Sequence, residues 1–462
     1  MGRLLIQCCS IQKGEFTMSA SVLFGRLLYK IITAFFSVIC AFTSLASPVR
    51  TEPQKAPDDF TPVVRFAVVS DVHISDNSEG VITDHSRSER LADLFKDSYE
   101  YAESCSYDRL DAVVVVGDMT GGGADVEYRE FNAVCDENIK DGTELLVMLG
   151  NHEFIDYRDT DPTVAYTKYR EFVNEEVDRH VTINGYHFVT CSYSDDAKTF
   201  STKKDWLREQ LDAATADTPD KPVFVFQHPQ PFGTVYGSVN WGNTEVASIF
   251  PSYPQVIDFS GHSHYAPTDP RSIWQGSYTA VGTGCLAALM GNLNYISGDE
   301  DAPGESGSFW IVEADAEGNV RLKLYDVVNH CFFEDTDYYL ADVSKKANHT
   351  YTWTNLKSLD TAPEFPVDAA ITAEKDNDGN VILRFPDAEG YWPAESYGIT
   401  VSDGFLSNAW SDTVISNYVR AVSDGMAVNI GEIPAGEYTV KITAMSPYAK
   451  TGETITGTIT VQ

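Results

Sequence analysis

The chain has 462 residues, 43% of them hydrophobic, and a formal net charge of −35 at pH 7. A chain of this length can bury a large core and is long enough for two domains. The negative charge argues against nucleic acid or another polyanion as the main partner, because neutralising phosphates requires a basic surface.

The N-terminus has the pattern of a signal peptide, which we predict to cover residues 1–46. Basic Arg26 and Lys30 precede an apolar stretch at 31–45, and Ser44-Leu45-Ala46 offers the small residues that a signal peptidase prefers. The apolar stretch is shorter than the ~20 residues that cross a bilayer, so we expect cleavage rather than anchoring. The mature chain is therefore expected to be secreted or periplasmic.

After this leader, apolar runs typical of buried strands alternate with segments whose apolar residues recur at helical spacing. That alternation predicts an α/β domain. Asn184-Gly185, between two strand patterns, is a strong hairpin signal. The predicted helices are 87–103, 125–139 and 202–214, the hairpin strands are 179–184 and 186–193, and two closing strands are 308–313 and 320–328.

Five short apolar runs each end in a cluster of Gly, Asp, Asn or His. In the first cluster Asp71 and His73 are two residues apart, a spacing at which the side chains of a strand return to the same side. The strand ends of an open α/β sheet gather along one edge, where ligands bind. The five clusters are Asp71-x-His73, Gly117-Asp118, Gly150-Asn151-His152-Glu153, His228 and Gly261-His262-x-His264.

This ordered set of clusters resembles the calcineurin-like metallophosphoesterase family, over roughly residues 64–325. The resemblance implies a layered α/β/β/α sandwich. It also implies two divalent metal ions that hold a bridging hydroxide as the nucleophile. Ligands of oxygen and nitrogen without thiolate suit manganese, iron or zinc, and the choice among these metals stays open. Matched position by position, the implied ligands are Asp71, His73 and His264 for one ion, Asn151, His228 and His262 for the other, and Asp118 as the bridge.

The resemblance gives His152 a catalytic role instead of a ligand role. It would steady the developing charge or protonate the leaving oxygen. Purple acid phosphatases carry a Tyr three residues after the bridging Asp, where this chain has Gly121, so a coloured ferric tyrosinate site is not expected. The Asp71-x-His73 form looks more like the branch that holds cyclic-nucleotide and glycerophosphodiester phosphodiesterases. That branch also holds monoesterases, so monoester and diester substrates both stay open.

Histidines outside the five clusters are interpreted as hydrogen-bonded structural residues, because a lone core His is more often structural than a ligand. His85 is different, since it lies in the loop after the first cluster and is a candidate for substrate contact. The histidines interpreted as structural are His180, His187, His330 and His349.

Three arginines and one tryptophan are further candidates for substrate contact. Arg87, Arg158 and Arg271 could clamp a phosphate, although a solvated Arg is the commoner case. The connection between His228 and Gly261 is long and is expected to shape the substrate entrance. Trp241 within it is a candidate substrate contact, against the commoner role of a packed aromatic residue.

The pattern changes after residue 345. From Val367 about seven short β segments separated by turn residues predict a smaller all-β sandwich, which resembles a fibronectin type III or immunoglobulin-like domain. Contact with cell wall or carbohydrate is one role for it, and plain stabilisation is another. No predicted ligand lies beyond His264, so a chain cut near Asp360 is expected to stay folded and active. The predicted divisions are a signal peptide at 1–46, a catalytic domain at 60–345, a linker at 346–366 and the sandwich at 367–462.

Two functions from different classes compete. The first is an exported binuclear-metal phosphoesterase that acts on small phosphomonoesters or phosphodiesters. The second is a cell-surface binding or adhesion protein in which the phosphoesterase-like domain is only a scaffold. The complete ligand set favours the enzyme, because a retired site is expected to have lost at least one ligand. The oligomeric state stays open.

Overall fold

The computed structural model describes residues 50–462 apart from 158–159, 197–199, 290–305 and 405–407, and the chain from Arg50 to Gln462 forms one compact unit. The predicted signal peptide and Arg158 lie outside the described residues. Of the helices that are described, none combines the length and apolar character needed to cross a membrane.

The first sheet has six strands, which in spatial order are β12 (Cys331–Leu340), β11 (Val320–Asp326), β10 (Ser308–Asp315), β1 (Pro62–Val69), β2 (Ala112–Val116) and β3 (Glu144–Met148). β1, β2 and β3 pair in parallel. β1 also pairs antiparallel with β10, which joins the start of the domain to its closing strands. The carboxyl ends of β1, β2 and β3 therefore lie at one edge of this sheet.

The second sheet also has six strands, in the spatial order β4 (Arg179–Ile183), β5 (Tyr186–Cys191), β6 (Val223–Pro229), β7 (Val256–Gly261), β9 (Thr279–Gly282) and β8 (Ile273–Gln275). β4 and β5 pair antiparallel across Asn184 and Gly185, so the predicted hairpin is confirmed. β5, β6 and β7 pair in parallel. Their carboxyl ends again share one edge.

The two sheets pack face to face through an apolar core. Alternate residues of β1 point to opposite faces, so Phe66 and Val68 enter this core while Ala67 and Val69 pack on the other side. Phe66 is fully buried and meets the rings of Phe188 and of Phe224 edge-on, with centroids 4.8 Å apart in both pairs. Burying a side chain of this size contributes about 2–3 kcal/mol to folding.

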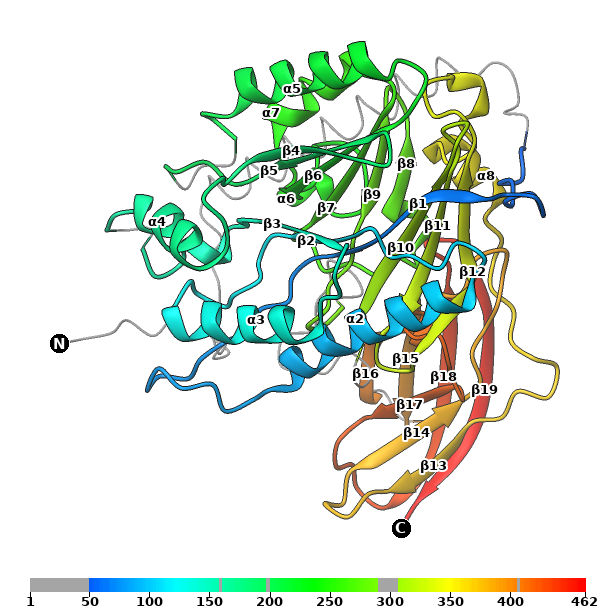
Figure 1. The fold of residues 1–462 in the computed structure, drawn as a ribbon. Helices are drawn as coiled ribbons and strands as arrows, with labels where there is room; N and C mark the ends of the chain where they lie inside the picture. Colours follow the sequence, from blue (N-terminus) through cyan, green and yellow to red (C-terminus); the bar gives the residue numbers. More distant parts are fainter. Residues whose placement is uncertain (1–49, 158–159, 197–199, 290–305, 405–407) are drawn as a thin grey trace, which may run out of the picture. The chain divides into compact units, whose positions relative to one another are not determined.

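Helices cover the outer faces of both sheets (Figure 1). Leu91, Leu94 and Phe95 recur at helical spacing and are buried against the first sheet, and Leu207 and Leu211 do the same against the second. The predicted α/β/β/α layering is thus confirmed. The helices on the first sheet are α2 (Ser86–Ser104), α3 (Asp125–Asn138) and α4 (Thr163–Phe172), those on the second are α5 (Lys204–Asp217) and α7 (Thr244–Ala247), and the remaining α-helices are α6 (Ser238–Trp241) and α8 (Trp353–Leu359).

Short 3-10 turns connect several of these elements. They are η1 (His152–Phe154), η2 (Phe250–Ser252), η3 (Pro270–Ser272), η4 (Lys346–Asn348) and η5 (Asn417–Val419). Of these, η1 begins four residues after the last residue of β3 and contains His152, so a tight turn places this residue near the edge where the parallel strands end.

The C-terminal segment forms two antiparallel sheets around a core of its own, as predicted for a small all-β sandwich. Tyr397 and Val440 are fully buried within that core. The resemblance to a fibronectin or immunoglobulin-like domain stays a prediction. One sheet has the order β13 (Thr372–Lys375), β14 (Val381–Phe385) and β17 (Met426–Asn429), and the other β16 (Asn408–Ile415), β15 (Ser396–Ser402), β18 (Gly436–Met445) and β19 (Thr451–Val461).

This β segment is joined to the α/β domain by buried polar and apolar contacts. The guanidinium of Arg271 donates to Glu395 over 2.6 Å. The hydroxyl of Ser446 donates to the carboxylate of Asp360 over 2.7 Å. Tyr418 belongs to a small apolar cluster with Ala266, Cys285 and Leu289 of the α/β domain. That a chain cut near Asp360 stays folded and active remains a prediction, and such a cut would expose buried surface and leave Arg271 without Glu395.

Candidate metal centre

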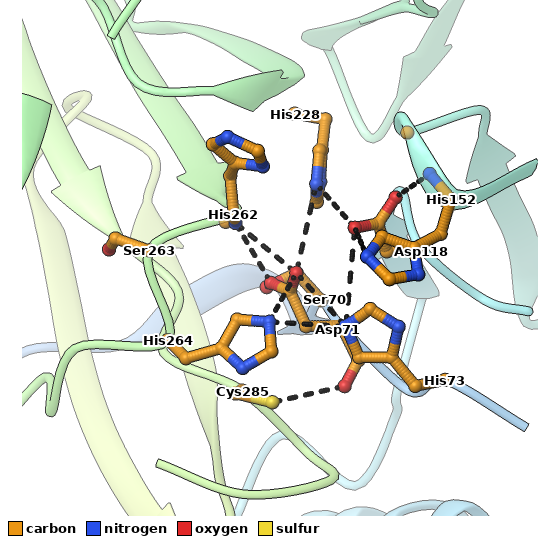
Figure 2. A network of polar contacts seen from close by, with 12 residues as sticks. Ser70, Asp71, His73, Asp118, His152, His228, His262, Ser263, His264 and Cys285 are labelled. Carbon is orange, nitrogen blue, oxygen red and sulfur yellow. Dashed lines mark hydrogen bonds and ion pairs between the residues drawn. The ribbon is translucent and has the colours of Figure 1, made fainter. Parts of the chain in front are cut away.

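The carboxyl ends of five parallel strands supply the predicted ligands. Asp71 and His73 follow β1, Asp118 follows β2, and Asn151 follows β3. On the second sheet, His228 lies near the end of β6, and the His262-Ser263-His264 segment follows β7. Figure 2 shows the side chains of Asp71, His73, Asp118, His228, His262 and His264 gathered around one small space.

Five of these residues have left-handed backbone conformations, with positive φ angles. A side chain in this region is close to its own backbone, at a cost of about 1 kcal/mol each, although Asp, Asn and His tolerate it better than most residues. Such strained positions gather at functional sites. The φ angles are 55° at Asp71, 52° at His73, 52° at Asp118, 74° at His262 and 55° at His264.

One ligand group consists of Asp71, His73 and His264. Their candidate ligand atoms all lie within 4.8 Å of one another. Nε2 of His264 is 3.1 Å from Oδ1 of Asp71 and 3.1 Å from Nε2 of His73. Burial alone would raise the pKa of Asp71, but His264 and His228 hold that pKa well below its usual range. The carboxylate is therefore ionised, as a metal ligand must be.

The second group consists of Asp118, His228 and His262, again with ligand atoms within 4.8 Å of one another. Nδ1 of His228 is 2.8 Å from the carbonyl oxygen of Val116, which can only accept, so Nδ1 carries a proton and Nε2 faces the site. Nε2 of His228 is 2.9 Å from Oδ2 of Asp118. Burial lowers the pKa of His228, but Asp118 and Asp71 outweigh burial and raise it to about 9 in the metal-free protein.

Asp118 belongs to two of the three ligand groups among the described residues. Its Oδ2 lies 2.9 Å from Nε2 of His228 and 4.0 Å from Nε2 of His73, and these two histidines are the predicted ligands of different ions. Burial would raise the pKa of Asp118, but His228, followed by His73 and His152, holds it below its usual range. Asp118 is therefore the carboxylate that would contact both ions if two were bound.

His152 lies beside this cluster and is partly exposed. Its backbone N–H donates to Oδ1 of Asp118 over 2.8 Å, and its Nδ1 is 3.0 Å from the carbonyl oxygen of Gly121. The carbonyl fixes the proton on Nδ1 and leaves Nε2 facing the site, 3.9 Å from Oδ2 of Asp118. His152 also completes the third group, with His73 and Asp118. Oδ1 of the adjacent Asn151 is buried.

Glu153 has a structural role that the sequence did not reveal. Its fully buried carboxylate accepts hydrogen bonds from the backbone N–H groups of Gly150 at 2.7 Å, Thr120 at 2.9 Å and Asp118 at 3.2 Å. Burial, together with Asp118, raises the pKa of Glu153 to about 7. One side chain thereby holds together the loops after β2 and β3. The only sequence signal was its place at the end of the Gly150-Asn151-His152-Glu153 cluster.

The glycines of these clusters are required by close approach. A Cβ at Gly150 would overlap the carboxylate of Asp118, and one at Gly261 would overlap the carboxylate of Asp71. Glycine at each position therefore lets a ligand carboxylate lie directly against the backbone. The same crowding explains why the clusters place Gly beside the residues that carry the chemistry.

The histidines interpreted as structural lie in hydrogen-bonded pairs away from the cluster. Nε2 of His180 is 2.9 Å from Nδ1 of His187, Nδ1 of His330 is 2.9 Å from Asp97, and Nε2 of His349 is 2.8 Å from the carbonyl of Val343. His85 is also engaged elsewhere, since its Nδ1 is 2.8 Å from Glu130.

Two of the candidate phosphate clamps have other partners. Arg87 donates to the carbonyl of His73 and to the hydroxyl of Ser75, so it supports the loop that carries His73. Arg271 is paired with Asp269 and Glu395. Trp241, by contrast, lies next to the cluster, with its ring centroid 6.5 Å from that of His262.

Comparison with known proteins bears on this site. The family model of the calcineurin-like phosphoesterases matches residues 64–266. No curated protein matches the chain. Among solved structures, a purple acid phosphatase from yellow lupin (Lupinus luteus) seeds is 14% identical over 62% of this chain, with a TM-score of 0.43, and the chain covers 55% of that protein. An endo-β-1,4-mannanase from Thermotoga petrophila is 10% identical over 86% of this chain and 98% of its own, with a TM-score of 0.23. TM-scores this low do not establish a shared fold.

Proposed function

Starting from the calcineurin-like phosphoesterase domain at residues 64–266, we propose that this protein is an exported hydrolase of small phosphomonoesters or phosphodiesters. The family match supports a metal-dependent phosphoric ester hydrolase. The observation that carries the proposal is the convergence of three ligand groups, which are linked because His73 belongs to two of them and Asp118 belongs to two of them. Export rests on the signal-peptide pattern at residues 1–46.

The donor set fits two divalent ions. Carboxylate oxygens and imidazole nitrogens dominate it, which suits manganese, iron or zinc. Two such ions bound together would polarise a phosphoryl oxygen and lower the pKa of a bound water. Asp118 would lie between the two charges and reduce their repulsion. The predicted holders are Asp71, His73 and His264 for one ion, Asn151, His228 and His262 for the other, and Asp118 for both.

His152 is the chain's own candidate for proton transfer. Its Nδ1 proton is committed to the carbonyl of Gly121, so Nε2 is the atom that can carry a proton to a leaving oxygen. The backbone bond to Asp118 fixes the start of the turn that presents the ring. The imidazole is partly exposed, so a substrate can reach it.

The β segment is not needed for this chemistry, because every predicted ligand belongs to the α/β domain. We propose carbohydrate or cell-wall contact as one role for it, on the basis of the predicted export alone. In the adhesion alternative this segment would carry the function, and the α/β domain would neither need metals nor turn over esters.

The test is a metal analysis of the purified mature protein followed by a panel of monoesters and diesters. We expect close to two divalent ions per chain and release of phosphate or alcohol from at least one ester class. Two bound ions without turnover of any ester would contradict the enzyme and favour a scaffold. No bound metal after loading with manganese, iron and zinc would contradict the site itself.

A further inference from the structure

The connection between β6 and β7 exposes three large apolar side chains within a stretch of ten residues. These are Phe232, Val239 and Trp241, and we call Phe232 and Trp241, whose backbones lie together, the apolar platform. Exposed apolar residues that occur singly need no explanation, but a group of them beside a site does. Phe232 and Trp241 emerge from adjoining backbone, because the Cα of Phe232 packs against Gly242 and its N–H bonds to the carbonyl of Asn243.

The platform adjoins the candidate metal centre. The ring of Trp241 meets the imidazole of His262 edge-on, with centroids 6.5 Å apart and an interplanar angle of 82°. The same indole lies 5.7 Å from the ring of Tyr265, the residue that follows His264. Trp241 is 40% exposed despite these contacts, so part of the indole is open beside a predicted metal ligand.

The platform is held by a stack of aromatic rings. Tyr265 stacks on Tyr236 with centroids 4.2 Å apart and an interplanar angle of 20°, and the guanidinium of Arg271 lies 3.7 Å from the centre of the Tyr236 ring. Gly237 has φ +83°, and a Cβ there would lie 2.7 Å from the ring of Tyr265. Glycine therefore lets the backbone lie directly against this ring. A side chain held this firmly loses little conformational entropy when a ligand covers it.

The charge of the connection restricts what the platform can bind. Residues 229–248 contain no Lys or Arg and one acid, Glu245. Arg271 beneath the stack is committed to Asp269 and Glu395. A second phosphate or another anionic group would find no Lys or Arg in residues 229–248, whereas a neutral flat ring would find an indole face.

We propose that the apolar platform binds the leaving group of the substrate, and that this group contains a neutral, flat aromatic ring. The proposal rests on the function proposed above, because the metal centre would hold the phosphoryl group while Trp241 takes the ring. Trp241 is then a specificity-determining residue. The ring would be an aryl group or a nucleobase, and both present the same stacking face.

The experiment compares Trp241→Ala, Phe232→Ala and a matched control with the metal-loaded wild type. Trp353→Ala is the control, because Trp353 is 43% exposed but lies on α8, outside the connection. The substrates are 2-naphthyl phosphate, adenosine 5′-monophosphate and glycerol phosphate. Stacking on an aromatic side chain is worth ~1–3 kcal/mol, so Trp241→Ala should lower the ratio of kcat/KM for naphthyl phosphate over glycerol phosphate by about 5- to 150-fold. Phe232→Ala should lower it less, and Trp353→Ala should leave it unchanged.

A ratio that Trp241→Ala leaves unchanged would overturn the proposal, and so would loss of metal in proportion to loss of activity, which would make Trp241 a support for His262. If Trp241→Ala lowers kcat/KM relative to glycerol phosphate for naphthyl phosphate but not for adenosine monophosphate, the platform binds aryl groups. If it lowers this ratio for both esters, the platform also binds nucleobases. Binding of phenylphosphonate and methylphosphonate to the metal-loaded protein gives a readout without turnover. If the wild type hydrolyses no ester, the proposed function fails. In that case the platform is tested by binding alone, and it fails if phenylphosphonate binds no tighter than methylphosphonate or if Trp241→Ala leaves that preference intact.

Discussion

Glu395 offers a direct test of whether the β segment stabilises the α/β domain. The carboxylate accepts from Arg271 at 2.6 Å and from the hydroxyl of Tyr236 at 3.0 Å, and its side chain is 10% exposed. In Glu395→Ala both donors lose this acceptor. Arg271 keeps Asp269, so its charge is not left without any partner.

The size of the effect follows from these contacts. Breaking a buried ion pair typically costs 3–5 kcal/mol, and leaving a buried hydroxyl unpaired costs about 1–3 kcal/mol. Two features reduce the sum. Asp269 still neutralises Arg271, and burial raises the pKa of Glu395 despite the opposing effect of Arg271, so desolvation already offsets part of the attraction. We expect Glu395→Ala to lower the free energy of unfolding by about 2–4 kcal/mol.

Urea denaturation followed by tryptophan fluorescence measures this loss. The matched control is Glu374→Ala, because Glu374 pairs with Arg384 over 2.7 Å while both side chains are more than half exposed. An exposed pair of this kind contributes at most about 1 kcal/mol. Glu395→Gln, which keeps an acceptor for Tyr236 but removes the charge, should fall between the two. If Glu395→Ala costs no more than Glu374→Ala, the buried contacts do not join the two parts of the chain energetically.

Three further outcomes test the site and its surroundings. Asp118→Ala should abolish ester turnover and strip metal, because both ions would lose a shared anionic ligand and repel each other; elemental analysis that finds two ions with normal turnover would contradict this role. His152→Ala should retain both ions while turnover falls by roughly 10²–10⁴-fold, with a smaller fall for esters that have acidic leaving groups; proportional loss of metal would instead make His152 a ligand or its support. Asp258 is fully buried, and burial raises its pKa to about 8 in the metal-free protein. Since the native state then binds more protons than the unfolded state between pH ~4 and ~8, the contribution of Asp258 to stability is lost as pH rises through this window. In urea titrations of the metal-free protein, the free energy of unfolding of Asp258→Asn should therefore exceed that of the wild type by more at pH 8 than at pH 5. An equal difference at both pH values would contradict the raised pKa of Asp258.

The strand-end clusters can be recognised in the sequence because their signal is local, whereas the roles of their residues as ligands stay a prediction. An apolar run followed by Asp71-x-His73 or by His262-x-His264 identifies both the strand and the side chains at its end. The parallel order of the strands then brings these ends together, as the distance of 3.1 Å between the Nε2 atoms of His73 and His264 shows.

Contacts between distant segments could not be predicted in the same way. Arg271 and Glu395 are 124 positions apart, and nothing in their spacing distinguishes a paired arginine from a phosphate clamp. Glu153 was visible in its cluster, but its three backbone donors come from two loops whose approach depends on the pairing of β2 with β3. The left-handed backbone at Asp118 is likewise set by tertiary structure, since Asp occurs in many conformations at strand ends.

The left-handed backbone at five predicted ligands bears on the survival of the protein in its environment. At about 1 kcal/mol each, these conformations together cost roughly as much as the lower end of a typical domain's whole stability, ~5–15 kcal/mol. Glycine at any one position would relieve that cost but remove a donor. Ions that bind the native state return the lost stability by mass action. A chain without ions lacks this added stability, so we expect proteases to degrade empty molecules faster than loaded ones.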